Sequence, residues 1–576
     1  MRKNSYDNIG RRSASFCIFV CISGLWWLSG CGMSRHKASS QADEKVYDII
    51  DRNWQDSFGA KANYRLIDPN AAADPNQITD SNNAILATLS KTGKLSLADA
   101  IQLAVTVSPE YQLAREQLYL TGLEQTEAEH LYELTPFASL AAGQSMARDS
   151  SSRTARMYEN EIRGGQATVG ISQLLATGAI LTTDFTLGSF DVVSGRYRSG
   201  PASFFQAAIS QPLLRGANRI VVLETLTQAQ RNTLYEIRTF NRFRKTFYVS
   251  VVDDYYRILK YSRQVYNAGE NMLKLKTIVQ RMESLAQVGM VPQFDLKRSR
   301  QNALKASDDY SQIRQIYEEA LDLYKNRLLI PQNMAIELDM NDWYKLEKMA
   351  SSEISISEQQ SLEAAFSARL DLANVFDQVE DAKRHVEVAA DGLGMDLTLV
   401  GTAAPASHQR FTLGADAGDM QRTQERYELG LRANLPLDRV AERNNYKRML
   451  IALMQTQRMH RHLSNQVEME VRKAWRDMNQ AKNRMAIQKQ ARDLAGKRLE
   501  DTLLLVQYGK ANATDVLDPQ RDYIAALDNY AAALTDFGIA KMRFLRDTEI
   551  LWINPEGRYE QRIAMEQKQP DLQRQN

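Results

Sequence analysis

The chain of 576 residues is 44% hydrophobic and 25% charged, which excludes both a disordered chain and a bundle of membrane-spanning helices. Its 72 Lys and Arg residues nearly balance its 70 Asp and Glu residues. Charge therefore gives no reason to expect nucleic acid or an anionic membrane surface as a partner.

The N-terminus has the pattern of a secretory signal, with basic residues followed by an apolar run over 16–28. The run ends in Leu28-Ser29-Gly30-Cys31, which resembles the lipobox of bacterial lipoproteins. That resemblance implies a signal peptide over 1–30, cleavage before Cys31 and attachment of lipid to Cys31. An ordinary signal peptide or a signal anchor is the alternative.

The next segment, 31–92, is polar and contains the breakers Asp68-Pro69 and Asp74-Pro75. We expect a lipid tether or a strap laid along the rest of the chain, with one short helix near 46–54.

Beyond this segment the chain repeats itself. A helical pattern begins near Ser96, a plausible N-cap, and again near Ser361. The interval from Pro212 to Pro436 is nearly the same as the interval from Gly289 to Gly509. These offsets predict a duplicated unit of roughly 200 residues or more, at 93–330 and 361–553, with a linker at 331–360 and a tail at 554–576.

Each repeat contains a long stretch without Pro that ends in Gly, followed after five residues by Asp. Gly can adopt the left-handed conformation that ends a helix, and Asp is favoured in the first turn of the next helix. The pattern predicts two helix–turn–helix apices, at 288–295 and 508–518. Each long arm is expected to be a helix of roughly 65 residues, or about 100 Å.

Residues 427–435 alternate strictly between apolar and polar, and 395–402, 180–187 and 205–210 do so in part. This alternation is typical of outer-membrane strands, although a soluble sandwich would share it. We predict strands within about 136–212 and 395–436, including an additional hairpin at 136–145 and 167–175 whose membership of a barrel stays open. The polar stretches at about 147–165, 190–201 and 404–424 are predicted to be loops.

Two principal strands in each repeat make four per chain, whereas the smallest membrane barrels have about eight. Open strand edges cannot lie in lipid. A barrel would therefore be shared, and three subunits would supply about twelve strands.

Together these features resemble the TolC-type outer-membrane efflux protein family, over roughly 93–553. The resemblance rests on the double apex and on three motifs in order: Ser210-Gln211-Pro212-Leu213-Leu214-Arg215-Gly216-Ala217, Leu435-Pro436-Leu437-Asp438-Arg439 and Asn512-Ala513-Thr514-Asp515-Val516-Leu517-Asp518. It implies a mainly α protein with membrane β structure, in which a homotrimer forms an α-barrel continuous with a shared twelve-stranded β-barrel. Residues 331–360 and 554–576, with help from the N-terminal strap, would form an equatorial belt.

The resemblance also assigns roles to the apices. Asp515 and Asp518 match the acidic residues of the family's periplasmic constriction, and threefold symmetry would gather six carboxylates there. Asp515 capping its own helix is the alternative, as is Asp518 as an N-cap before Pro519 in the first helical position. Asp295 is expected to polarise its helix. The surface on which a periplasmic adaptor docks would include Val288, Gly289, Asp295, Tyr508, Gly509 and Lys510.

The sequence contains no candidate catalytic residue, cofactor site or phosphate loop, and His460 and His462 have the wrong spacing to share a helical face. We therefore expect no enzyme but a passive, lipid-anchored exit duct that extends from the outer membrane into the periplasm. Its partners would be an adaptor and an inner-membrane transporter, in an efflux or type I secretion system. The alternative is a periplasmic coiled-coil lipoprotein with a structural or adhesive role.

Overall fold

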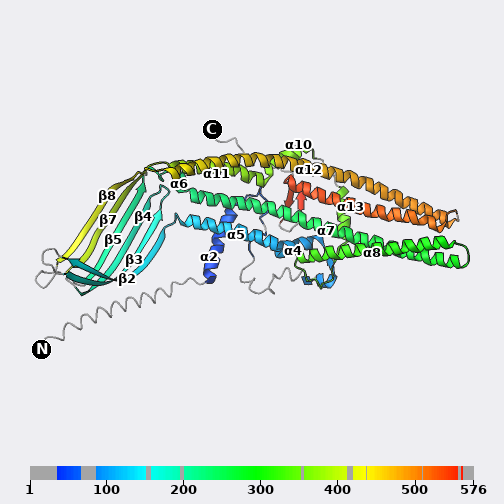
Figure 1. Cartoon of the computed structure of the whole chain (residues 1–576), viewed down its shortest axis with the longest axis horizontal. Helices are drawn as coiled ribbons and strands as arrows, with labels where there is room; N and C mark the ends of the chain where they lie inside the picture. Colours follow the sequence, from blue (N-terminus) through cyan, green and yellow to red (C-terminus); the bar gives the residue numbers. More distant parts are fainter. Residues whose placement is uncertain are drawn as a thin grey trace, which may run out of the picture.

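The computed structural model describes residues 35–61, 63–66, 86–87, 89–150, 157–194, 200–351, 356–411, 420–435, 437–508, 510–554 and 559–561. The predicted signal segment, Cys31, Pro436, Gly509 and most of the predicted tail lie outside these residues. The molecule is elongated, with a sheet at one end and the tips of two helical hairpins at the other (Figure 1).

Two long helices run through the molecule, α7 (Glu224–Gln287) and α12 (Val440–Gln507). Their 64 and 68 residues confirm the predicted arms, since helices of this length span about 100 Å. Each turns back into a shorter helix that packs against it, α8 (Gln293–Arg327) after α7 and α13 (Leu517–Asp547) after α12. The result is two helical hairpins in contact through α7 and α13 (Figure 1).

Toward the sheet, four helices lie side by side in the order α5, α7, α11, α12. The two that complete this set are α5 (Pro109–His130) and α11 (Leu370–Asp391), which occupy equivalent places in the two repeats. Shorter helices precede or flank them: α4 (Leu97–Val107), α6 (Arg219–Val222), α9 (Asn341–Ser351) and α10 (Glu358–Ala368).

The helix starts can be compared with the predicted caps. Ser96 caps α4, with its hydroxyl accepting the N–H of Asp99 at 3.2 Å, as predicted. The first helix of the second repeat, α10, starts earlier than predicted. Ser357 forms a capping box with Gln360, and Ser361 lies inside the helix.

The sheet contains six antiparallel strands in the order β2-β3-β4-β5-β7-β8. Their bounds are β2 (Thr135–Ser150), β3 (Met157–Leu174), β4 (Ile180–Ser194), β5 (Gly200–Pro212), β7 (Asp396–Phe411) and β8 (Met420–Asn434). The additional hairpin of the first repeat, β2 and β3, belongs to this sheet.

The prediction of loops at 147–165, 190–201 and 404–424 was wrong for most of their length. Strands continue through 147–150, 157–165, 190–194, 404–411 and 420–424. Polar residues interrupt the apolar period of two in these segments. Backbone pairing between strands does not need one.

The N-terminal strap is a longer helix than predicted, α2 (Arg35–Asn53), and it packs on α5 and α7. Gly122 of α5 permits this close approach, because a Cβ at Gly122 would lie 2.7 Å from Val46. Tyr119 of α5 donates a hydrogen bond to Asp43 at 2.7 Å. This helix of the strap thus lies along the helical body.

The main core lies near the middle of the molecule, where the strap, the linker and both repeats meet. Strand β1 (Lys94–Leu95) pairs in parallel with β6 (Glu337–Leu338) of the linker. The buried hydroxyl of Tyr255 donates to Leu95 O and to Asp342, at 3.0 and 2.7 Å. The linker therefore contacts the first repeat directly. Strands β9 (Leu551–Ile553) and β10 (Tyr559–Gln561) form a small separate sheet after α13.

Candidate functional site

The first helix tip joins α7 to α8 through a Schellman motif. The N–H of Gly289 donates to Ala286 O at 3.2 Å, and that of Met290 donates to Leu285 O at 3.0 Å. Gly289 has a φ of +77°, which explains the glycine, since no atom lies within 4 Å of where a Cβ would be. The predicted turn is confirmed.

The second tip repeats the hydrogen bond of the first. The N–H of Lys510 donates to Leu505 O at 2.9 Å, in the place equivalent to the bond from Met290 to Leu285 in the first repeat. A short 3₁₀ helix, η1 (Ala513–Val516), then leads into α13. Asn512 and Asp515 form a capping box, in which the Asp515 carboxylate accepts the N–H of Asn512 at 2.8 Å.

The three acidic candidates have different surroundings. Asp515 is exposed and also makes the capping contact, so the two predicted roles are geometrically compatible. Asp518 is exposed and forms ion pairs with Arg298 of α8 at 3.6 Å and with Arg521 at 3.5 Å. Asp295 lies in the first turn of α8, where it faces the positive end of the helix dipole.

Asp518 is not the N-cap of α13, so that alternative was wrong. Val516 occupies the N-cap, and Pro519 is the third residue of the helix and is buried. Proline fits there because the N–H groups of a helix's first turn have no carbonyl acceptor within the helix, so no hydrogen bond is lost. Because the short η1 helix leads directly into it, α13 begins at Leu517, two residues before Pro519.

Exposed apolar side chains gather at both tips. Val288, Met290, Phe294 and Tyr508 are 66–74% exposed, and Lys510 is exposed beside them. The sequence analysis named Val288 and Tyr508 but missed Met290 and Phe294. Their places next to Gly289 and at the start of α8 were the signal that could have identified them.

The two hairpins are joined a short way behind the tips. Leu517 packs with Leu275 and Ala306. Gln520 donates to Asn271 at 3.2 Å, and Asn267 donates to Asp528 at 3.0 Å. Apolar and polar contacts therefore hold α13 of the second repeat against α7 of the first.

At the opposite end of the molecule, one face of the sheet is apolar across all six strands. Residues that are paired directly share a face, and the shared face carries Ala138, Leu140, Val169, Ile171, Phe185, Leu187, Phe205, Ile209, Leu397, Leu399, Leu429 and Leu431. The other face carries mostly polar or small residues, including Thr168, Thr186, Asp184, Gln206, Thr402, Glu428 and Arg432. Such a division suits lipid on one side and water on the other.

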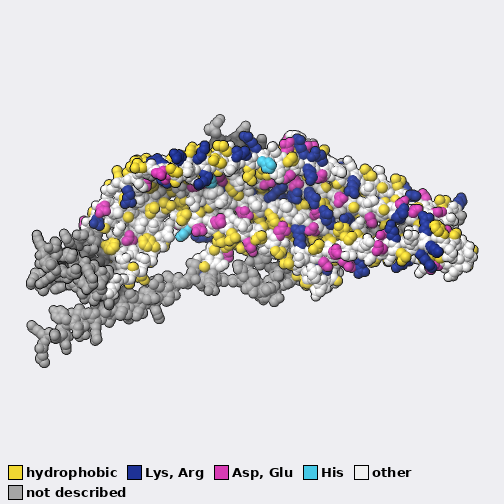
Figure 2. All heavy atoms as spheres, in the orientation of Figure 1, with side chains coloured by type: hydrophobic (Ala, Val, Ile, Leu, Met, Phe, Trp, Pro, Cys, Tyr) yellow, Lys and Arg dark blue, Asp and Glu magenta, His cyan; other side chains and the backbone are white. Residues whose placement is uncertain are grey.

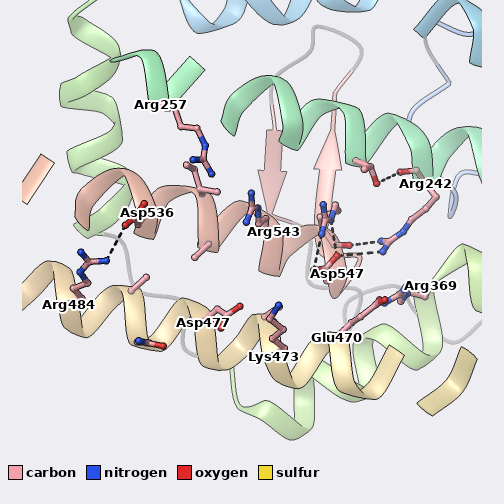
Figure 3. Close-up of a pocket in the computed structure, with 17 residues that line it drawn as sticks. Arg242, Arg257, Arg369, Glu470, Lys473, Asp477, Arg484, Asp536, Arg543 and Asp547 are labelled. Carbon is pink, nitrogen blue, oxygen red and sulfur yellow. Dashed lines mark hydrogen bonds and ion pairs between the residues drawn. The ribbon is translucent and has the colours of Figure 1, made fainter. Parts of the chain in front are cut away.

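Between the sheet and the tips, α7, α12 and α13 enclose a charged cleft of about 830 Å³ (Figure 3). Most of its charges are paired, for example Arg484 with Asp536 at 3.4 Å and Arg546 with Asp547 at 2.8 Å. Charges of both signs are also interspersed over the helical body (Figure 2). The lining carries seven basic and four acidic side chains, so the cleft is polar with an excess of positive charge.

One partly buried ion cluster of this cleft joins the start of α11 to α12. Arg369 binds Asp371 through two hydrogen bonds, of 3.0 and 2.7 Å, and Glu470 through one of 2.7 Å. Burial opposes ionisation of Asp371, but the hydrogen bonds and charge of Arg369 outweigh it and hold the pKa of Asp371 below its ordinary 3.8. The pKa of Glu470 is likewise lowered from 4.5, because burial is outweighed by hydrogen bonds from Gln466 and Arg369.

A lowered pKa stabilises the fold above the ordinary pKa, and the contribution is lost as the pH falls through the folded value. We expect Asp371→Asn to lower the free energy of unfolding by about 1–3 kcal/mol at pH 7. The effect should shrink as the pH falls below 3.8 through the lowered pKa of Asp371. Urea unfolding at pH 7 and at a series of pH values below 3.8 checks this. Glu380→Gln is the control, since Glu380 and its partner Lys383 are exposed, and it should change stability by less than about 0.5 kcal/mol. A pH-independent effect of Asp371→Asn would contradict the assignment.

Within the described part of the chain, no helix is both long enough and apolar enough to cross a membrane. The same residues contain no group of His, Cys, Asp and Glu side chains arranged to hold a metal ion.

Comparison with known proteins bears on the fold. Over 80% of its length, the chain is similar to the Campylobacter jejuni CmeC outer membrane channel, with a TM-score of 0.55, 13% identity and 86% of that channel covered. The fold is that of the TolC-type outer-membrane channels. The outer membrane protein VceC of Vibrio cholerae has a TM-score of 0.53 at 13% identity, with 78% of this chain and 95% of VceC covered.

A third similar structure is CusC, a protein that forms a transmembrane channel. It has a TM-score of 0.55 at 11% identity, with 78% of this chain and 91% of CusC covered. No family model and no curated protein sequence matches the chain. The TolC-type fold predicted from the sequence is thus confirmed by structure alone.

Proposed function

We propose that the protein is a passive exit duct of the outer membrane. Three copies would surround a water-filled channel, with the sheet in the membrane and the long helices extending into the periplasm. The observation that carries this proposal is the continuity of an apolar-faced sheet with helices of about 100 Å. A duct needs no catalytic residue or cofactor, because charge and width select what passes.

The division of the chain follows the same proposal. A signal peptide (1–30) would be removed, and lipid on Cys31 would anchor the strap (31–92) to the outer membrane. The two repeats (93–330 and 361–553) would build the duct, and the linker (331–360) and tail (554–576) would contribute to its belt.

The helix tips would form both the entrance and the docking surface. Val288, Met290, Phe294 and Tyr508 offer apolar area to a periplasmic adaptor protein, together with Gly289, Asp295, Gly509 and Lys510 around them. An inner-membrane transporter of an efflux or type I secretion system would supply the energy. Asp515 and Asp518 would line the constriction and attract cations to it.

Conductance in planar bilayers tests the duct and its entrance. We expect discrete openings that divalent cations on the periplasmic side reduce. Asp515→Asn should raise the half-blocking concentration about tenfold, which corresponds to about 1.4 kcal/mol of cation binding. The amide oxygen of Asn can still accept the Asn512 N–H, so this variant removes the charge and keeps the cap.

Asp515→Ala, which removes both, is the matched comparison. If only the Ala variant changes the block, Asp515 acts as a cap and the acidic entrance is wrong. Absence of conductance from a confirmed trimer would contradict the duct and favour a structural coiled-coil lipoprotein.

A further inference from the structure

The β2–β3 hairpin is joined to the rest of the sheet over most of its length. β2 pairs with β3 from Thr135 opposite Ser172 to Ser150 opposite Met157. β3 in turn pairs with β4 from Leu174 opposite Ile180 to Glu161 opposite Ser194. The family resemblance implies four strands per chain, so this hairpin adds two.

The hairpin also continues the apolar face. Leu140 of β2 and Val169 of β3 are 68% and 62% exposed on the same face as Phe185 and Leu187 of β4. A hairpin that extended above the membrane or folded into the channel would have no reason to share this face. Its division of apolar and polar residues therefore matches the other four strands.

The turn between β3 and β4 is anchored to the junction of sheet and helices. Gln211 of β5 donates to Thr177 O at 2.9 Å and accepts from the Thr177 hydroxyl at 3.1 Å. Gly178 has a φ of +80°, and a Cβ there would lie 2.5 Å from Gly216 O. The close approach requires glycine, so the turn is fitted to this place.

The two edges of the sheet are β2 and β8, and each pairs on one side only among the described strands. Six antiparallel strands leave these edge strands running in opposite directions. If β8 of one copy lay beside β2 of the next, they would also be antiparallel. The same arrangement can then repeat without a break.

We propose that three copies close a barrel of eighteen strands, in which β8 of each copy pairs with β2 of the next. This inference rests on the proposed trimeric duct and replaces the twelve strands that the family resemblance implies. The occupant of each open edge is thus a second copy of this chain.

The strand registers agree with a closed barrel. Rows of directly paired residues move away from the helical end of the sheet as they cross from β2 to β8. The row that starts at Thr135, the first residue of β2, ends at Glu428 of β8. Glu428 lies six residues before the last residue of β8, Asn434. Six residues over five steps give a tilt of roughly 40° at about 3.3 Å per residue and about 4.8 Å between strands. Membrane barrels have tilts of about 35–45°.

The width of the helical part agrees as well. Four helices per chain (α5, α7, α11 and α12) approach the sheet, so a trimer has twelve, and a spacing of about 10 Å gives a circumference of about 120 Å. Eighteen strands at a tilt of about 40° give about 110 Å, whereas twelve give about 75 Å. Eighteen strands would make the membrane part nearly as wide as the helical part. The narrowest point of the duct would then lie at the helix tips.

The slope of these rows also predicts the register between copies. If the rows of paired residues continue at the same slope from β8 to the next copy's β2, Leu431 lies opposite Leu140 of that copy, on the apolar face. A cysteine in each place tests this pairing, so the double variant Leu140→Cys with Leu431→Cys should form a reducible covalent trimer on oxidation. Ala138→Cys and Ala142→Cys, each combined with Leu431→Cys, cover a shift of two residues in either direction.

In the control, the cysteine of β2 is moved from position 140 to position 185 of β4, which lies at the same height in the sheet. In a twelve-stranded barrel without the hairpin, β4 and not β2 would meet β8, and Phe185→Cys with Leu431→Cys would cross-link. Each variant is first shown to be trimeric by light scattering in detergent. Cross-linking through β4, or through none of the three β2 positions in a trimer, overturns the eighteen strands but leaves the duct. A protein that is never trimeric overturns the proposed function itself.

Discussion

Replacing Glu549 with Gln is expected to lower the free energy of unfolding by about 3–5 kcal/mol, because it removes a buried negative charge that compensates the cations of Arg242 and Lys245. The Glu549 side chain is 1% exposed and binds Arg242 at 2.7 Å and Lys245. Both cations belong to α7, whereas Glu549 follows α13. The carboxylate therefore joins the two repeats, and urea unfolding in detergent measures its contribution.

The backbone at Glu549 provides a control. Its φ is +59°, a left-handed conformation that glycine adopts most easily. Leu329, its counterpart in the first repeat and also just past a helix end, has a φ of +51°. Leu329→Gly removes such strain without touching an ion pair and should be close to neutral. Glu549→Gly should still destabilise the protein, and a stabilising effect there would show that the carboxylate contributes little.

The repeat and the long helices could be predicted from the sequence because their signals are local. Gly289 and Gly509 define the offset between the repeats, and the same offset relates Leu329 to Glu549 at the ends of the second helices. The absence of Pro gave the lengths of α7 and α12. Alternation of side chains placed the apolar parts of the strands.

Other features depend on contacts that no local pattern encodes. The strands continue into polar sequence, where backbone pairing extends the sheet. Whether the β2–β3 hairpin joins the sheet depends on its pairing with β4. At the tips, the spacing of Asn512 and Asp515 predicts a cap, but the pairing of Asp518 with Arg298 needs the packing of two hairpins. The left-handed Glu549 has no glycine to mark it.

The apolar face of the sheet leads to the second large effect. Leu429→Arg is expected to prevent stable insertion in the outer membrane, because an arginine facing lipid near the bilayer midplane costs about 2–4 kcal/mol in each chain. Leu429 is 80% exposed on that face and lies opposite Gly401. Three copies would each bear this cost in one barrel. Flotation of membranes and the heat-modifiable trimer band on gels measure the outcome.

Gly430→Arg is the matched control, one residue away on the opposite face. A Cβ at Gly430 meets no atom within 4 Å, so the new side chain has room. It would join Glu428 and Arg432 on the polar face, which the proposal assigns to the water-filled channel. Gly430→Arg should therefore insert and assemble like the unaltered protein. If both variants insert equally well, lipid does not cover the apolar face, and the sheet must be buried against protein instead.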